Sequence, residues 1–274
     1  MQKGSPSLPK TLLAALRKTP SRYANPDSDQ NCTTIASYNI HKCVGTDRRF
    51  DPARIVDVVC ELDADIVALQ EADERFGNRE GLLNLAALKE RANLVPVDLQ
   101  GNLRSHGWHG NVILARDGIV GDVKCMALPG LEPRGALIVD LELKGVHLRI
   151  IAAHFGLLRH SRSRQASALV DAMHPVLRPT ILLGDLNEWR VRKRSSLLAL
   201  LPHFGPVHAI VPSFPSRYPL LALDRILASP HNLISSIDVH DSALSRVASD
   251  HLPLKARLDL KAVAPVEIPL REAG

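Results

Sequence analysis

The chain is poor in cysteine and in aromatic residues, and each shortage argues against a class of protein. Its four cysteines show no Cys-x-x-Cys spacing and no partnering cluster of histidines. We therefore interpret them as reduced thiols rather than as a zinc site or a disulfide framework. Aromatic residues make up only 4% of the chain, whereas proteins that hold long single strands of nucleic acid stack the bases on aromatic side chains. The composition argues weakly against a polymer-binding protein of that kind.

Long hydrophobic runs are also absent. No stretch approaches the roughly 18 to 20 consecutive apolar residues that span a bilayer, so no transmembrane segment is expected. The first ten residues lack the charged-then-apolar order of a signal peptide. We therefore expect a cytoplasmic location, with a peripheral position on a membrane as the alternative.

The residues that are present suit a basic globular protein. Hydrophobic residues make up 45% and charged residues 23% of the 274 residues, which argues against global disorder. The formal net charge is +5, and this favours anionic partners. Phosphate esters, nucleic acid and anionic membrane surfaces all meet that description, and the charge does not choose among them.

The chain is predicted to form one domain with two tails. Residues 1–30 are predicted to form a loosely ordered N-terminal extension. In an alternative interpretation, a short basic helix over residues 8–18 contacts an anionic membrane surface. Residues 31–262 carry the regular apolar spacing of a single catalytic domain, and residues 263–274 form a C-terminal tail.

The apolar spacing predicts many strands separated by single helices. Asp51 and Pro52 predict a helix start, because an N-cap residue is followed by proline at the first helical position. Two sheets packed face to face with helices outside would bury this many apolar strands, so we predict an α/β protein. The predicted helices cover residues 52–62, 80–92, 161–174 and 195–201. The predicted strands cover residues 33–38, 64–69, 94–98, 111–115, 119–126, 136–143, 148–153, 180–183, 223–228, 233–239 and 252–260.

Residues 181–190 combine an apolar strand with polar residues at its end. The strand has no apolar/polar alternation, which is typical of a strand covered on both faces, and Gly184 is expected to end it. Asp185 and Asn187 point to the same side if the backbone stays extended. A carboxylate and an amide placed together can take a proton and hold an oxyanion. The alternative is an ordinary β-turn with Asx capping.

Other polar residues stand at or just beyond the ends of predicted strands, where ligand sites of layered α/β proteins usually lie. Each of them alone could be a turn residue, a helix cap or a buried polar side chain that forms its hydrogen bonds within the core. Six such positions at corresponding ends indicate one site. The positions are Asn39, Glu71, His154, Asp185 with Asn187, Asp224, and Asp250 with His251.

These residue types match what water attack on phosphorus requires: a base, neutralisation of charge and a Lewis acid. Glu71 is a hard oxygen ligand suited to Mg²⁺. Asp185 can deprotonate or orient a water, and His251 can be held cationic by carboxylates so that it stabilises charge at phosphorus. Three further side chains can support the phosphate group: Asn39, Asn187 and His154.

Three more residues are candidates for substrate binding. His41 follows Asn39 closely at the end of the first strand, and Arg134 precedes a predicted strand where it can meet phosphate. Asn111 can line the pocket, or it can satisfy a backbone group at a strand end. The basic run over residues 190–194 can hold anionic groups or form a solvated charged face.

Six motifs follow one another along the chain: Tyr38-Asn39-Ile40-His41, Leu69-Gln70-Glu71, His154-Phe155-Gly156, Gly184-Asp185-Leu186-Asn187, Leu223-Asp224-Arg225-Ile226 and Ser249-Asp250-His251-Leu252-Pro253. In this order they resemble the endonuclease/exonuclease/phosphatase superfamily, also called DNase-I-like, from about residue 33 to residue 260. The resemblance implies a four-layer α/β/β/α sandwich with two mixed β-sheets. It also implies phosphoester hydrolysis with a divalent metal ion, Mg²⁺ or alternatively Mn²⁺.

The resemblance further implies roles for the site residues. Asp185 would orient or activate the attacking water, and Asn187 would bind the phosphate. His251 would be the essential imidazole with Asp224 as its partner carboxylate, and His154 would be a second histidine. The implied metal ligands are Glu71, helped by Asn39 and, in some members, by Asp250.

Further motifs are similar to a bacterial branch of this superfamily that is often linked with cardiolipin-synthase genes: Asn39-Ile40-His41-Lys42, Arg48-Arg49-Phe50, His109-Gly110-Asn111, Asn187-Glu188-Trp189-Arg190, Phe214-Pro215 and Pro219-Leu220-Leu221. They imply a phospholipid-related or other compact phosphodiester as substrate. The alternatives are a metal-dependent nuclease of DNA or RNA, and a non-catalytic scaffold that binds anions. The complete set of Glu71, Asp185, Asn187 and His251 favours an enzyme over the scaffold.

Overall fold

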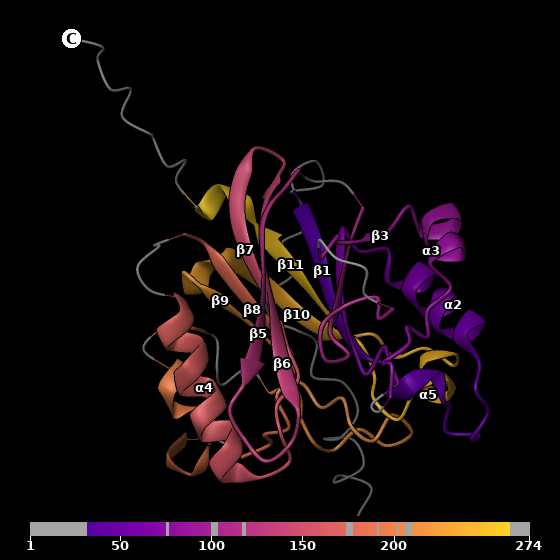
Figure 1. The fold of residues 1–274 in the computed structure, drawn as a ribbon. Coiled ribbons are helices and arrows are strands. Elements are labelled where there is room, and N and C mark those ends of the chain that lie inside the picture. The colour runs from indigo at the N-terminus through magenta and orange to yellow at the C-terminus, as the bar shows by residue number, and fades with distance from the viewer. Residues whose placement is uncertain are drawn as a thin grey trace, which may run out of the picture.

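The computed structural model describes residues 32–74, 77–99, 104–116, 119–173, 178–190, 192–201, 203–205 and 210–263. Within these residues, two mixed β-sheets pack face to face with helices on both outer faces (Figure 1). This arrangement confirms the predicted four-layer sandwich. The N-terminal extension over residues 1–30 and nearly all of the C-terminal tail lie outside the described residues, so these boundaries remain predictions.

The strands of each sheet come from distant parts of the chain. In spatial order, the first sheet consists of β10 (Ile234–Val239), β11 (Leu254–Asp259), β1 (Cys32–Asn39), β2 (Ile66–Gln70), β4 (Val112–Ala115) and β3 (Val95–Pro96). The second sheet consists of β5 (Ile119–Leu128), β6 (Arg134–Leu143), β7 (Val146–Ala153), β8 (Thr180–Asp185) and β9 (Asp224–Ser229). The pairs β1–β2 and β7–β8 are parallel, and the other pairs are antiparallel.

Helices cover the outer face of each sheet. The first sheet is covered by α2 (Pro52–Leu62), α3 (Leu85–Ala92) and α5 (Ser245–Ala248), and the second by α4 (Arg159–Met173). Short 3₁₀ turns cover His41–Cys43, Arg192–Arg194, Leu198–Leu200, His231–Leu233 and Leu260–Ala262. Among the described residues, no helix is long and apolar enough to cross a membrane.

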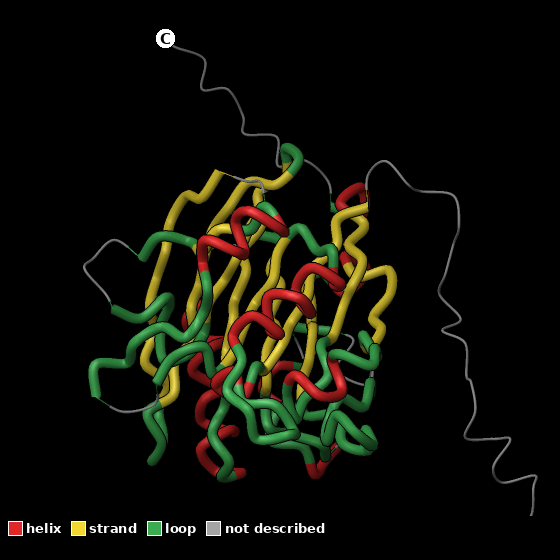
Figure 2. Tube along the Cα trace, turned by 90° about the vertical axis from the view of Figure 1, so that its right-hand side faces the viewer, coloured by secondary structure: helices red, strands yellow, loops and turns green. Residues whose placement is uncertain are grey.

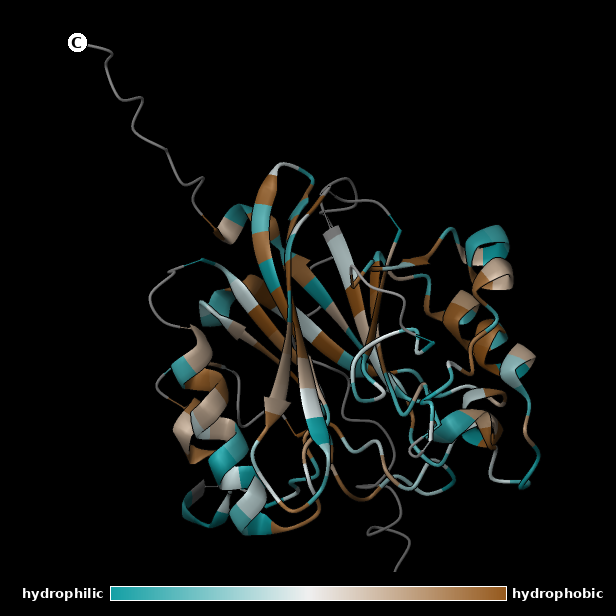
Figure 3. Cartoon of the chain, in the orientation of Figure 1, coloured by the Kyte–Doolittle hydropathy of each residue, from teal (hydrophilic) through white to brown (hydrophobic). Residues whose placement is uncertain are grey.

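The strands lie between two apolar environments, which explains their continuous apolar runs. In β1, Ile35 belongs to the core between the sheets, whereas Tyr38 packs towards the helices. In β8, Leu183 belongs to the core between the sheets and Leu182 packs with α4. The hydrophobic colouring of the strands in Figure 3 follows this burial. Strands fixed on both faces hold the side chains at their ends in place.

The helix predicted over residues 80–92 is shorter in the structure. It begins at Leu85, because Asn84 acts as the N-cap and its Oδ1 accepts the backbone N–H of Ala87 at 3.0 Å. The residues before the cap pair with the loop after β2 instead, for example through the backbone N–H of Leu82 and the carbonyl of Ala72 at 3.1 Å.

The helix predicted over residues 195–201 is wrong. That segment contains only the 3₁₀ turn Leu198–Leu200, because Ser196 bonds to Glu188 through both its backbone N–H and its hydroxyl. Conversely, the four-residue helix α5 was not predicted, since one turn is too short to show an apolar period.

The strand β8 runs two residues further than predicted. Gly184 lies inside the strand, which ends at Asp185. A Cβ atom at position 184 would lie 1.9 Å from the carbonyl oxygen of Ala153, and Gly184 has a φ of +143°. Only glycine fits both conditions. The close approach sets Asp185 directly beside the end of β7, where its carbonyl accepts the N–H of Phe155 at 2.9 Å.

Loops gather at one end of the sandwich, where many strands end or begin (Figure 2). This end contains the carboxyl ends of β1, β2, β7 and β8 and the start of β9. The polar residues singled out by the sequence lie in or beside these loops.

Candidate active site

Strand alternation turns three strand-end residues towards the same space. Asn39 ends β1, Asp185 ends β8 and Asp224 begins β9. Each lies an even number of residues from members of the core between the sheets, such as Ile35 and Leu183. The period of two therefore points all three polar side chains into the space between the sheets.

The carboxylate of Asp185 is the centre of this group. Its Oδ2 accepts a hydrogen bond from Asn39 Nδ2 at 3.0 Å, and it lies 3.5 Å from His154 Nε2 and 3.8 Å from His251 Nε2. Its Oδ1 accepts the backbone N–H of Asn187 at 2.9 Å. Because only 2% of Asp185 is exposed, protein groups rather than water surround its charge.

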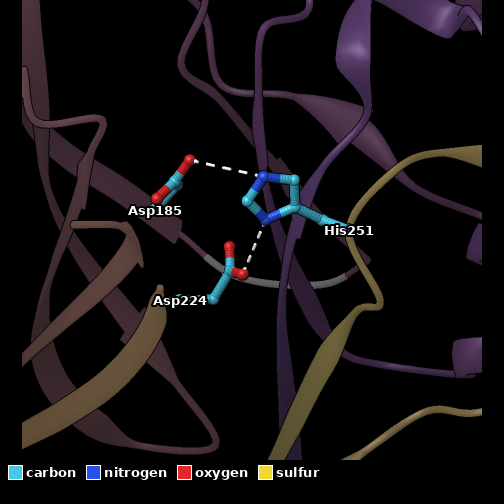
Figure 4. A group of neighbouring side chains, drawn as sticks. All are labelled: Asp185, Asp224 and His251. Atoms are coloured by element: carbon cyan, nitrogen blue, oxygen red, sulfur yellow. Dashed lines mark hydrogen bonds and ion pairs between the residues drawn. The ribbon is translucent and has the colours of Figure 1, made fainter. Parts of the chain in front are cut away.

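His251 lies between two carboxylates (Figure 4). Its Nδ1 is 2.8 Å from Asp224 Oδ2, and its Nε2 faces Asp185. Burial alone lowers the pKa of this imidazole, but the carboxylates of Asp224 and Asp185 more than offset it and raise the pKa to about 10. This raised pKa favours a buried imidazolium at neutral pH.

Asp224 is held by a residue that the motifs do not reveal. Ser213 Oγ donates to Asp224 Oδ2 at 2.5 Å. The next residue, Phe214, packs its ring against that of His251 with the centroids 4.9 Å apart. Serine is common in loops, and its distance in the chain from Asp224 matches no known spacing. Only the folded loop shows that Ser213 belongs to the site.

Asp185, Asp224 and His251 lie close enough to hold an ion, with one ligand atom from each within 4.8 Å of the others. A histidine ligand must be neutral, however. The raised pKa of His251 keeps its ring protonated, and both ring nitrogens face carboxylates. The cluster therefore also suits an ion-pair network.

Arg134 sets the orientation of His154. Its Nη1 donates to His154 Nδ1 at 3.0 Å. Because arginine has no acceptor, the ring proton lies on Nε2, which faces Asp185. Arg134 also donates to Glu132 Oε2 through Nε at 3.2 Å and Nη2 at 2.9 Å. Arg134 thus lies at the site as expected, although its contact with phosphate remains a prediction.

Glu71 faces a pocket that adjoins this group. The backbone of Glu71 has a φ of +57°, which turns the chain sharply after β2. Its Oε2 lies 3.8 Å from Lys42 Nζ. The pocket is lined by Glu71, Lys42 and Arg79, and by Arg134 and His154 from the Asp185 group. His154 therefore joins the two groups, because it lines the pocket with Glu71 and faces Asp185.

The oxygen donors near this pocket fit Mg²⁺ or Mn²⁺. Asn39 pairs in register with Gln70, so Asn39 and Glu71 lie at the ends of neighbouring parallel strands. Their carboxamide and carboxylate oxygens are the donors that these cations prefer. Asp250 is a third oxygen donor, and its Oδ1 lies 3.8 Å from His41 Nδ1. Its part in metal binding remains a prediction.

The residues His41–Cys43 form a left-handed turn beside the site, with φ values of 45°, 53° and 59°. Such a conformation costs roughly 1–2 kcal/mol for each non-glycine residue. Asn39 Oδ1 supports the turn by accepting the backbone N–H of His41 at 3.0 Å. The turn places Lys42 near Glu71, while His41 Nδ1 contacts the carbonyl of Val44 at 3.0 Å. Substrate contact by His41 remains a prediction.

The side chains of the two remaining asparagines both donate to backbone carbonyls. Asn187 has a φ of 51°, so the backbone is not extended after Asp185, and the N–H of Asn187 caps Asp185 as in an Asx turn. Its side-chain Nδ2 donates to the carbonyl of Phe155 at 3.0 Å. Asn111 is fully buried and donates to the carbonyls of Trp108 and Gly135. These bonds favour its alternative role as a partner for backbone groups.

The fold and the site together define a class of protein. A four-layer sandwich with a buried carboxylate between two imidazoles at its strand ends is suited to hydrolysis at phosphorus. The chain belongs to the Endonuclease/Exonuclease/phosphatase family, whose model matches residues 36–251. Enzymes of this family hydrolyse phosphoesters and generally use divalent metal ions.

Solved structures of the same fold confirm the architecture. An endonuclease/exonuclease/phosphatase from Beutenbergia cavernae has a TM-score of 0.62 at 22% identity, covering 84% of this chain and 72% of that chain. The mannosyl-6-phosphatase Bt3783 of Bacteroides thetaiotaomicron has a TM-score of 0.62 at 19% identity, with 83% and 99% covered. TDP2 of D. rerio, in complex with a single-strand DNA product, has a TM-score of 0.60 at 14% identity, with 83% and 99% covered. No curated protein sequence matches the chain.

Proposed function

We propose that this protein is a divalent-metal-dependent hydrolase of a compact phosphodiester, with a phospholipid-related ester as the preferred substrate class. The observation that carries the reaction type is the position of Asp185 between His154 and His251, with Glu71 in the adjoining pocket. The resemblance to the branch linked with cardiolipin-synthase genes and the low aromatic content support the substrate class.

In the proposed reaction, Asp185 orients the attacking water and accepts its proton. Asn39 and His154 hold this carboxylate through contacts to Oδ2, so it is already in place before the substrate arrives. The backbone N–H of Asn187 donates to Oδ1 of Asp185 and fixes the position of that oxygen. A water placed against Asp185 attacks phosphorus, and the leaving alkoxide takes up a proton from solvent or from a nearby acid.

His251 supplies positive charge where negative charge develops. Its imidazolium is buried and held by Asp224, so it needs no reorganisation during the reaction. Its proton also makes it a candidate donor to the phosphoryl oxygens. Arg134, one residue of the pocket wall, adds a second cation near the same oxygens.

Glu71 and Asn39, with Asp250 as a third donor, would hold Mg²⁺ or Mn²⁺. When bound, such an ion polarises a phosphoryl oxygen as a Lewis acid. Lys42 lies 3.8 Å from Glu71 and balances the charge of that carboxylate. Asn39 donates to Asp185 through Nδ2, whereas its Oδ1 accepts the N–H of His41 and has a second lone pair, so the two proposed roles use different atoms.

A nuclease is the second candidate, because TDP2 was solved with a single-strand DNA product and the net charge of this chain is +5. A substrate screen separates the two. The purified protein would be assayed with Mg²⁺ or Mn²⁺ on DNA, RNA, sugar phosphates and phospholipids, with Asp185→Asn as the inactive control. We expect metal-dependent turnover of a phospholipid or another compact diester to exceed that of DNA and RNA. Efficient cleavage of a polynucleotide alone would reverse the assignment.

A further inference from the structure

Large apolar side chains are exposed on the loops around the candidate active site. Leu131 is 86% exposed, Tyr218 and Leu220 are each 76% exposed, and Leu157 is 63% exposed. Scattered single cases are normal on protein surfaces, but a group at one end of the molecule marks an interaction site. We call this group the apolar rim: Leu131, Leu157, Leu158, Trp189, Tyr218 and Leu220.

All six residues of the apolar rim belong to loops at the catalytic end of the strands. Leu131 lies in the turn between β5 and β6, and Leu157 and Leu158 follow β7. Trp189 follows β8, and the loop with Tyr218 precedes β9. Three of these loops adjoin His154, Asp185 and Asp224, so the apolar rim lies at the same end of the sandwich as the site.

Polar contacts join three of these loops to one another. The backbone N–H of Leu157 donates to Glu132 Oε1 at 2.7 Å, which ties the loop after β7 to the β5–β6 turn. Arg162 donates to the carbonyl of Leu157 and lies 3.5 Å from Glu188, the residue before Trp189. The apolar rim is therefore held on a fixed frame.

The other side of the apolar rim is joined in the same way. Arg225 donates to the carbonyl of Glu188 at 2.9 Å and to that of Ala222, so it links the loop after β8 with the loop before β9. Arg217 donates to the carbonyl of Thr46 at 3.3 Å, which links that loop to the one after β1. Phe50, 59% exposed, extends the apolar surface on this side.

Exposed cations lie next to the apolar side chains in sequence. Arg159 follows Leu158, Arg217 precedes Tyr218, and Arg49 precedes Phe50. Arg48 is a further exposed cation in the last of these loops. In the described part of the chain, none of these four arginines forms an ion pair, so their charges are available to an anionic partner.

We propose that the apolar rim and its arginines dock the catalytic end of the protein onto an anionic phospholipid surface. Leucine side chains enter the boundary between headgroups and acyl chains, tryptophan and tyrosine settle at headgroup level, and arginines pair with lipid phosphates. Docking in this orientation brings the ester of a lipid headgroup to Asp185. The inference rests on the proposed function only for this last step, because binding itself needs no chemistry.

The same chemistry argues against two other occupants. Four of the six residues are leucines, which offer no ring for stacking nucleic-acid bases. A second copy of the chain would bring the same unpaired arginines face to face, and like charges across an interface are unfavourable. A membrane surface with negative charge satisfies both the leucines and the arginines.

Vesicle co-sedimentation tests the proposal. The full chain would be mixed with vesicles of phosphatidylglycerol and phosphatidylcholine, or of phosphatidylcholine alone, in chelator so that no turnover occurs. We expect binding to the anionic vesicles, weakened by a factor of about 10 or more in a Leu157→Ser/Leu158→Ser variant. Arg217→Gln should weaken binding to anionic vesicles and make the remaining binding less sensitive to added salt, because one electrostatic contact is lost. Val120→Ser, which removes a 38% exposed side chain at the opposite end of β5, is the matched control.

The outcomes separate docking from hydrolysis. Unchanged turnover of a soluble diester by the double leucine variant, together with lost vesicle binding, supports docking by the apolar rim. Absence of vesicle binding by the wild-type chain overturns the proposal and leaves the proposed hydrolase function untouched. Sedimentation as a dimer that the leucine changes disrupt, or competition by single-strand DNA without vesicle binding, would assign the apolar rim to another partner and equally overturn it.

Discussion

The carboxamide of Asn39 donates a hydrogen bond to Asp185 Oδ2 at 3.0 Å, and this bond joins the two sheets at the site. Asn39 ends a strand of the first sheet, and Asp185 ends a strand of the second. His251 and Asp224 form a second link of the same kind, from the loop before β11 to the start of β9. The geometry of the site therefore depends on how the two sheets pack.

Replacing either member of the Asp185–His251 pair should abolish most of the activity. We expect Asp185→Asn and His251→Gln each to lower kcat by a factor of about 100 or more, because one removes the proton acceptor and the other the buried cation. Steady-state assays would measure this, with circular dichroism to verify folding. Asp238→Asn, on the exposed side of β10, is the matched control. Near wild-type turnover by a folded Asp185→Asn variant would contradict the proposed mechanism.

The pH profile should depend on Asp224. The carboxylates around His251 raise its pKa to about 10, so activity that needs the imidazolium should fall as the pH rises through that value. Asp224→Asn removes the partner that is hydrogen-bonded to Nδ1, which lowers the pKa of His251. We expect the alkaline limb of kcat/KM to move to lower pH in this variant. An alkaline limb that stays in place would show that another group titrates.

The same pKa shift should make stability depend on pH. Folding raises the pKa of His251 from about 6.5 to about 10, so the folded state binds the proton more tightly than the unfolded state. This contribution is fully present below pH 6.5 and is lost as the pH rises towards 10. Urea unfolding at several pH values would measure it. The slope over this window should be smaller in His251→Gln than in the wild type, and equal slopes would contradict the assignment.

Activity should require a divalent metal ion bound near Glu71. We expect activity to disappear in excess chelator and to return with Mg²⁺ or Mn²⁺. Glu71→Gln should raise the metal concentration for half-maximal activity by a factor of about 10 to 100, because a carboxylate ligand is lost. Calorimetric titration of the metal gives a readout without turnover. Glu142→Gln, on the outer part of β6, serves as the control, and full activity without metal would rule the requirement out.

Arg134 should act through His154 as well as through its charge. Lysine keeps the charge but cannot bind Glu132 and His154 with a planar fork, so Arg134→Lys should lower kcat by a factor of about 10. A role limited to attracting phosphate predicts instead a raised KM with kcat nearly unchanged. Separate measurement of kcat and KM decides between these two roles.

The architecture was predictable because strand patterns are local. Runs such as residues 180–183 are apolar on both faces, and their number already required two packed sheets. Strand alternation then sets which side a residue faces, so Asn39, Asp185 and Asp224 could be placed on one side of the fold from their positions alone. Helix ends were harder to predict, because Ser196 bonds to Glu188 instead of entering a helix, and no local pattern shows that contact.

The sequence by itself determined the order of strands and motifs and the family, and it predicted hydrolysis of a phosphoester. Tertiary structure alone decided that Ser213 supports Asp224, that Asn187 turns away from an extended path, and that six exposed side chains form one apolar rim. The physical reason is the separation along the chain of the residues that interact. A strand period acts between neighbouring residues, whereas these contacts join loops far apart in the chain, and their positions follow from the packing of the sheets beneath them.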